Sequence, residues 1–232
     1  MKLKRYLIEI TAPSVDMATQ VLEVVFKDVR SLLTKIDAFD IDDHMALKIL
    51  KTGFDKVGVK LEMGSDLKSV KKYISSAEFG GKYGSDYHWL IKMKPGFSDI
   101  FKRFATSKGW KYMENPTKNP LMRELVDTLS HEILHTKQAL GSGGAAFDPE
   151  LQGMQSTYTG NLKDYLKNPI EIEPFAQQAA IDTIRMGEKN SPIIKNYKSS
   201  FPSGSKTLKK FLKKYSLYLI QLKKEGDITP FK

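Results

Sequence analysis

The sequence predicts an α+β fold, in which a mixed N-terminal region is followed by a mainly helical C-terminal part. Two segments in the first hundred residues alternate between apolar and polar residues, as half-buried strands do, and later segments carry apolar residues at helical spacing. The 232 residues are enough to bury a full core, and 41% hydrophobic with 28% charged residues is typical of globular proteins. We expect one domain over residues 1–188 and a basic helical appendage over residues 189–232.

Two helices are expected near the N-terminus. Ser14 can cap the first, which would run to about residue 38 with valines and leucines at helical spacing on its buried side. Asp42 or Asp43 can cap the second, which would end near Phe54. His44 follows these aspartates, and the three side chains could bind a metal, but a helix cap beside a solvated histidine is the expected arrangement.

Three segments of the N-terminal region are prone to form strands. Residues 6–10 are short and β-prone, whereas residues 57–63 and 87–93 alternate between apolar and polar side chains. Residues 79–86, which contain three glycines, are expected to form a turn or hairpin tip between the last two segments.

The longest predicted helix begins at Asn119 and ends near Gly141. Asn119 can cap it, Pro120 stands at the favoured first helical position, and leucines recur at helical spacing through the segment NPLMRELVDTLSHEILHTKQAL. The second half of this helix spells H-E-x-x-H, with histidines at 131 and 135 and a glutamate at 132. Residues four apart lie on one helix face, so both imidazoles can bind the same metal ion.

This pattern is typical of a zinc hydrolase. Glu132 lies at the edge of the face that carries His131 and His135, where it can hold a water at the metal and take its proton without being a ligand. Because the chain contains no cysteine, Zn²⁺ would be bound by histidine and carboxylate.

The third protein ligand is expected to be a carboxylate. No histidine follows His135, and Gln138 and Gly141 occupy the places of the glycine and the third histidine in the extended H-E-x-x-H-x-x-G-x-x-H pattern. Glu171 and Glu173 stand at the start of a further predicted helix, whose small apolar residues would allow close approach to the first. The alternative for both glutamates is an ordinary role as first-turn acids that stabilise the helix dipole.

The segments HEILHTKQ and YLKNPIEIEPFA resemble zincin metallopeptidases whose third zinc ligand is a glutamate on a later helix. They are most similar to the small metallopeptidases encoded by bacteriophages, which carry H-E-x-x-H-x-x-Q and then Y-x-x-N-P-x-E-x-E-A. The resemblance implies a zincin-like fold, in which a small mixed sheet packs on the H-E-x-x-H helix. It also implies Zn²⁺, a protein or peptide substrate, Glu132 as general base and Glu173 as third ligand, with Glu171 next in line. Pro174 departs from the alanine of the family, so the choice between the two glutamates stays open.

In a zincin-like fold an edge strand lies along the cleft, where it can pair with an extended peptide. The segment that begins at His88 is the candidate for this strand, and an interior strand without a substrate role is the alternative. His88 could stabilise a developing oxyanion, and Tyr158 and Tyr165 compete with it for that role.

Positive charge is concentrated at the C-terminus. Residues 189–232 contain eleven lysines, no arginine and two acidic residues, and therefore carry nine of the ten net positive charges. A strongly amphipathic basic helix is expected there, with one apolar face formed by Leu208, Phe211, Leu212, Tyr215, Leu219 and Leu222. This face can dock on the core while the lysines are solvated, or the lysines can also bind an acidic or polyanionic partner. The absence of arginine argues against base-specific readout.

The remaining expectations concern location and function class. No apolar run approaches the eighteen residues of a membrane helix, and the N-terminal segment, interrupted by Glu9, does not match a signal peptide. We therefore expect a cytoplasmic protein without a membrane partner, which includes a virus-encoded protein in the host cytoplasm or virion. A zinc-dependent peptidase is the predicted function. The alternative is a non-catalytic protein of a virion, assembly or polyanion complex that retains a zincin fold.

Overall fold

A computed structural model confirms the α+β class: the chain is mostly helical and contains one small mixed sheet among the residues described. The structure describes residues 14–33, 41–65, 71–79, 88–103, 119–141 and 161–224. The chain divides into two compact units, Met1–Ile133 and Leu134–Lys232, and the division falls inside a helix. Each unit is described by itself. The domain boundary expected after residue 188 does not coincide with this division. The predicted strand at 6–10, the turn beyond Phe79 and Tyr158 lie outside the described residues.

In the first unit, helix α2 (Ser14–Leu33) packs against helix α3 (Asp43–Phe54). The α2 stripe predicted from the sequence is buried, with Leu22, Val25 and Val29 inaccessible to solvent. Asp42 caps α3, since its carboxylate accepts a hydrogen bond from the backbone N–H of Met45 at 2.7 Å. The first turn after α3 is a short 3₁₀ helix, η2 (Asp55–Val57).

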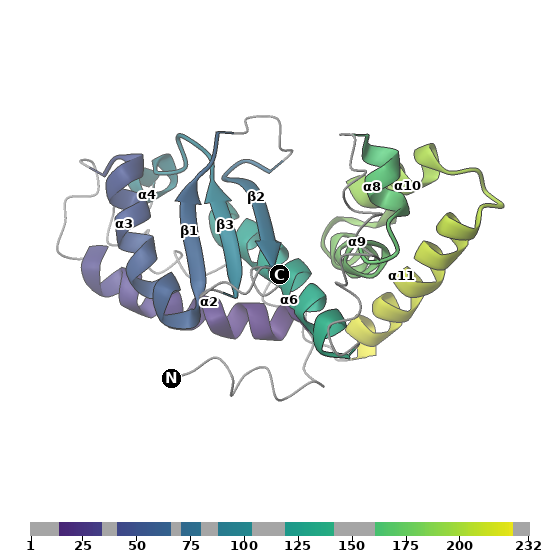
Figure 1. Cartoon of the computed structure of the whole chain (residues 1–232), viewed down its shortest axis with the longest axis horizontal. Helices are drawn as coiled ribbons and strands as arrows, with labels where there is room; N and C mark the ends of the chain where they lie inside the picture. The colour runs from purple at the N-terminus through teal and green to yellow at the C-terminus, as the bar shows by residue number, and fades with distance from the viewer. Residues whose placement is uncertain are drawn as a thin grey trace. The chain divides into compact units, whose positions relative to one another are not determined.

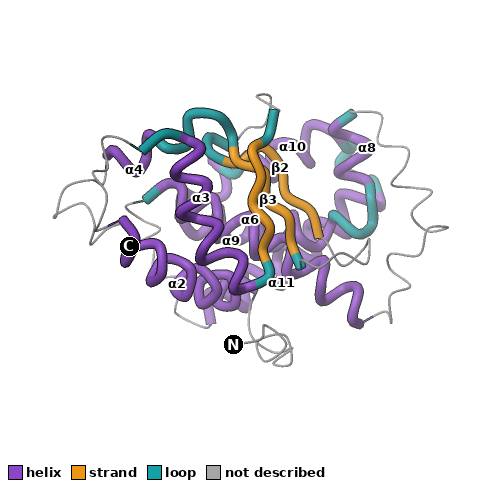
Figure 2. Tube along the Cα trace, turned by 60° about the vertical axis from the view of Figure 1, so that its left-hand side comes forward, coloured by secondary structure: helices purple, strands orange, loops and turns teal. Residues whose placement is uncertain are grey.

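The sheet contains β1 (Val59–Met63), β2 (Ile74–Phe79) and β3 (Trp89–Met93) in the order β1-β3-β2. Strand β3 runs parallel to β1 and antiparallel to β2, and the three strands lie side by side in Figure 2. The segment expected to form an edge strand is therefore the central strand of the sheet. Four of its five residues are buried, because such a strand is covered on both faces.

Two further helices follow: α4 (Asp99–Arg103) lies in this unit, and α6 (Pro120–Gly141) begins in it and continues into the second unit. The Asn119 side chain caps α6 as predicted, accepting from the backbone N–H groups of Leu121 and Met122 at 3.0 and 3.3 Å. The carboxylate of Glu124 on α6 accepts from the N–H groups of Lys72 and Tyr73 at 2.8 and 2.7 Å. These bonds tie the first half of α6 to the start of β2.

The second unit is helical. It contains the end of α6, the short 3₁₀ helix η5 (Glu188–Asn190) and four α-helices labelled in Figure 1: α8 (Leu162–Lys167), α9 (Ile172–Met186), α10 (Pro192–Ser200) and α11 (Lys206–Lys224). Helix α11 packs along α9. Tyr197 and Phe211 stack at the centre of this unit with ring centroids 3.8 Å apart, and both are fully buried. No described helix is both long and apolar enough to cross a membrane.

Candidate metal centre

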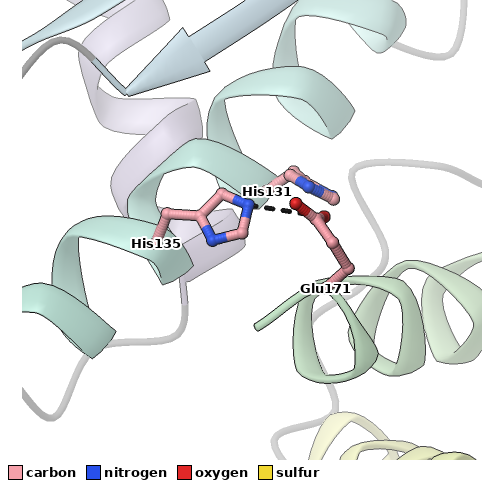
Figure 3. Close-up of side chains that lie close together, drawn as sticks. All are labelled: His131, His135 and Glu171. Atoms are coloured by element: carbon pink, nitrogen blue, oxygen red, sulfur yellow. Dashed lines mark ion pairs between the residues drawn. The ribbon is translucent and has the colours of Figure 1, made fainter. Parts of the chain in front are cut away.

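Helix α6 brings the two histidines of the H-E-x-x-H pattern together. His131 and His135 are one turn apart and project from the same face, as Figure 3 shows. His135 is buried and His131 is partly exposed. Their relative placement is set by α-helical geometry alone, because the hydrogen-bonded helix continues through both residues.

Gln138 orients the His135 ring. The side-chain amide of Gln138 donates from Nε2 to the backbone carbonyl of Ile170 at 3.1 Å, which turns its Oε1 toward His135 Nδ1, also at 3.1 Å. Since Oε1 is an acceptor, Nδ1 is the donor in this contact, and Nε2 is the ring nitrogen that faces Glu171. Metal-binding histidines commonly have their second ring nitrogen held in this way.

Glu171 supplies the carboxylate that faces these histidines. Its Oε2 lies 3.5 Å from His135 Nε2, and both side chains are buried. These two atoms form an ion pair when His135 is protonated, and a metal cation bound between them would take the place of that proton. Ligands of a tetrahedral Zn²⁺ with N and O bonds near 2.0–2.2 Å are about 3.3–3.5 Å apart, so this separation suits a metal.

One potential ligand atom from each of His131, His135 and Glu171 lies within 4.8 Å of the others (Figure 3). Two imidazoles and one carboxylate form a donor set that suits Zn²⁺ among common metals, and the set leaves a position for water. The chemistry of these three residues therefore fits an open site for a divalent transition metal such as Zn²⁺.

Glu173, the other predicted ligand, faces a different helix. Its Oε1 accepts from Lys214 Nζ at 2.8 Å and from the Tyr218 hydroxyl at 3.0 Å, both on α11. Burial would raise the pKa of Glu173, but the hydrogen bond and charge of Lys214, aided by Tyr218 and Gln138, hold it below its ordinary value. Residues two apart at a helix start differ by about 200° around the axis, so only one of the two glutamates can face the histidines. The structure brings Glu171 to them.

Glu132, the expected general base, is buried on α6, and Lys71 is its positively charged neighbour. The ammonium of Lys71 donates to the hydroxyl of Thr128, one turn before Glu132 on α6. Burial lowers the pKa of Lys71, whereas the attraction of Asp127, Glu132 and Glu124 opposes this shift. Lys71 and Glu132 therefore lie close enough for their charges to interact.

His88 and Tyr165, the residues proposed from the sequence for oxyanion stabilisation, do not belong to the three-residue cluster. His88 precedes β3 and covers Gly58, whose positive φ of 74° and close approach leave no room for a side chain. Burial lowers the pKa of His88. Tyr165 lies on α8 and packs edge-on against Phe175, with ring centroids 5.4 Å apart. Their catalytic roles stay predictions.

Three residues around the site are given no contact with it in the sequence-based interpretation: Gln138, Lys71 and Lys214. Gln138 could have been found, because it lies three residues after His135 and so shares its helix face. Lys71 and Lys214 reach the site region from distant parts of the chain, and no local pattern marks them.

Comparisons of the chain with protein-family models, curated proteins and solved structures gave no match. The resemblance to glutamate zincins therefore stays a prediction, and the case for a metal centre depends on the geometry of these residues.

Proposed function

We propose that this chain is a zinc-dependent peptidase, with His131, His135 and Glu171 as metal ligands and Glu132 as general base. The observation that carries the proposal is the three-residue cluster, in which the ligand atoms lie within 4.8 Å of one another and a buried imidazole faces a buried carboxylate. The adjacent Glu132 favours hydrolysis over a structural metal site, because a structural site needs no base beside its ligands.

Bound zinc would supply a Lewis acid that polarises the scissile carbonyl and lowers the pKa of water to roughly 7. The carboxylate of Glu132 accepts a proton from the water as the water oxygen bonds to the carbonyl carbon. It then donates that proton to the leaving nitrogen as the C–N bond breaks. Gln138 holds the ring of His135 in the orientation that points Nε2 at the site.

Metal analysis with matched variants tests this function. The purified protein should bind one equivalent of Zn²⁺, and His131→Ala or His135→Ala should abolish tight binding. Glu132→Gln should retain the metal and the fold but lose peptide hydrolysis by several orders of magnitude, because only proton transfer is removed. Retention of a full equivalent of zinc in the double histidine variant would refute the ligand assignment. Undiminished hydrolysis by Glu132→Gln would refute the general base.

A second candidate function is polyanion binding by α11, favoured by its surface charge. The helix carries seven lysines and no acidic residue, and Lys209, Lys210 and Lys213 are exposed. Lysines attract phosphates without reading bases. Changing these three lysines to glutamine should weaken binding to a nucleic acid of mixed sequence and reduce the salt dependence of that binding. An unchanged salt dependence would exclude this surface.

A further inference from the structure

Hydrogen bonds hold the chain on both sides of Glu171, at the start of α9. On one side, the carbonyl of Ile170 accepts from Gln138 of α6 at 3.1 Å. On the other side, Glu173 accepts two hydrogen bonds from α11, from Lys214 at 2.8 Å and Tyr218 at 3.0 Å. The candidate ligand thus lies between two anchored residues, both within the second compact unit.

The contacts of Glu173 are suited to fix the backbone at the start of α9 as well as the Glu173 side chain. Two donors on one carboxylate oxygen leave Glu173 few rotamers, and the glutamate is partly covered, with 30% of its side chain exposed. Lys214 is likewise partly covered, at 39%. Since Glu171 is only two residues away in the same helical turn, the direction of its carboxylate depends on where this turn is held.

We infer that α11 is part of the metal site: Lys214 and Tyr218 are positioning residues that hold Glu173 and thereby orient the Glu171 carboxylate for a divalent transition-metal ion. This inference rests on the metal ligands of the proposed function. It also changes one expectation from the sequence, that residues 189–232 form a basic appendage beside the main domain. Of the lysines on the middle of α11, Lys214 contributes to the site, whereas Lys213 is exposed and has no ion-pair partner within the described ranges.

Neighbouring lysines provide a matched test. Lys214→Met and Lys213→Met make the same chemical change on adjacent residues of one helix, so any general effect of lost charge is shared. Zinc affinity, measured by competition with a chelating indicator, should fall about tenfold for Lys214→Met, at the lower end of what residues behind a metal ligand contribute. Lys213→Met should bind zinc as the unchanged protein does, and Lys214→Arg should restore most of the affinity because it keeps a donor to Glu173.

Tyr218→Phe removes a single hydroxyl and provides the test if Lys214→Met does not fold. It should weaken zinc binding several-fold, and in a Glu173→Gln background neither substitution should add a further loss, as expected for residues that act through one carboxylate. Equal zinc affinity of the unchanged protein, Lys214→Met and Tyr218→Phe would refute the positioning role while leaving the ligands intact. Absence of zinc binding by the unchanged protein would instead refute the proposed function.

Discussion

Replacing Gln138 with methionine tests the metal centre at a residue that does not touch the metal. Methionine matches the length and approximate volume of glutamine but can neither accept from His135 Nδ1 nor donate to the carbonyl of Ile170. Both hydrogen bonds, each 3.1 Å long, are lost. The ring of His135 then loses the group that selects its tautomer, and the start of α9 loses one of its anchors.

The expected loss of zinc affinity follows from the burial of His135. His135 is only 7% exposed, so water does not readily replace the lost acceptor. Loss of a partner by a buried donor costs about 1–3 kcal/mol, which corresponds to roughly 5- to 150-fold in an equilibrium constant. Measured losses for residues behind a metal ligand, about 10–100-fold, fall in the same range. Gln138→Met should therefore bind Zn²⁺ about 10–100-fold more weakly.

Competition against a chelating indicator at neutral pH measures this affinity, and circular dichroism verifies that the variant is folded. Gln178→Met, the same change on a partly exposed residue of α9, is the control. Gln138→Glu retains an acceptor for Nδ1 but loses the donor to Ile170, and should give an intermediate loss. If Gln138→Met is folded and binds zinc within twofold of the unchanged protein, the assignment of the His135 tautomer is wrong.

Two other predictions concern charged residues. Glu171→Ala should abolish tight zinc binding, whereas Glu173→Ala should only weaken it; the reverse order, by the same competition assay, would make Glu173 the ligand. The burial of Lys71 predicts that stability depends on pH. Burial lowers the pKa of the Lys71 ammonium in the folded protein, whereas a lysine of the unfolded chain has a pKa near 10.4. Between these two pKa values the unfolded chain binds more protons, so the free energy of unfolding should rise with pH relative to Lys71→Met. Urea unfolding at about pH 7 and about pH 10 measures this difference, and a constant difference would contradict the effect of burial.

The parts of the fold that local patterns encode were predictable. Helix α6 has a strong cap, a proline at its first position and a long apolar stripe, and it begins where predicted. Strand β2 was not predicted, since its sequence ISSAEF alternates poorly and the strand contains a register shift between Ile74 and Ser76. The central place of β3 depends on pairing with strands from elsewhere in the chain, which its own sequence does not specify.

The candidate site was likewise predictable only in part. The two histidines follow from spacing on one helix, but the choice of carboxylate depends on the phase of another helix. Asn168 and Pro169 have the side chains of a helix start, yet they form a turn in which Asn168 accepts from the N–H of Ile170 at 3.1 Å. Helix α9 begins only at Ile172. With this start, Glu171 faces the histidines. A helix that began about one residue earlier or later would turn the side chain by about 100° around the helix axis.

The lysines of α11 also repel one another. Lys206, Lys209, Lys210, Lys213 and Lys214 form five like-charged pairs at spacings of three or four residues, where such pairs destabilise a helix by about 0.2–0.5 kcal/mol each. Helix α11 therefore owes its stability to its buried apolar face and to Glu173 rather than to its surface. Salt screens the repulsion between exposed charges, and it also weakens attraction to a polyanion. Increasing ionic strength should consequently stabilise this helix against unfolding while it releases any polyanion bound to its surface.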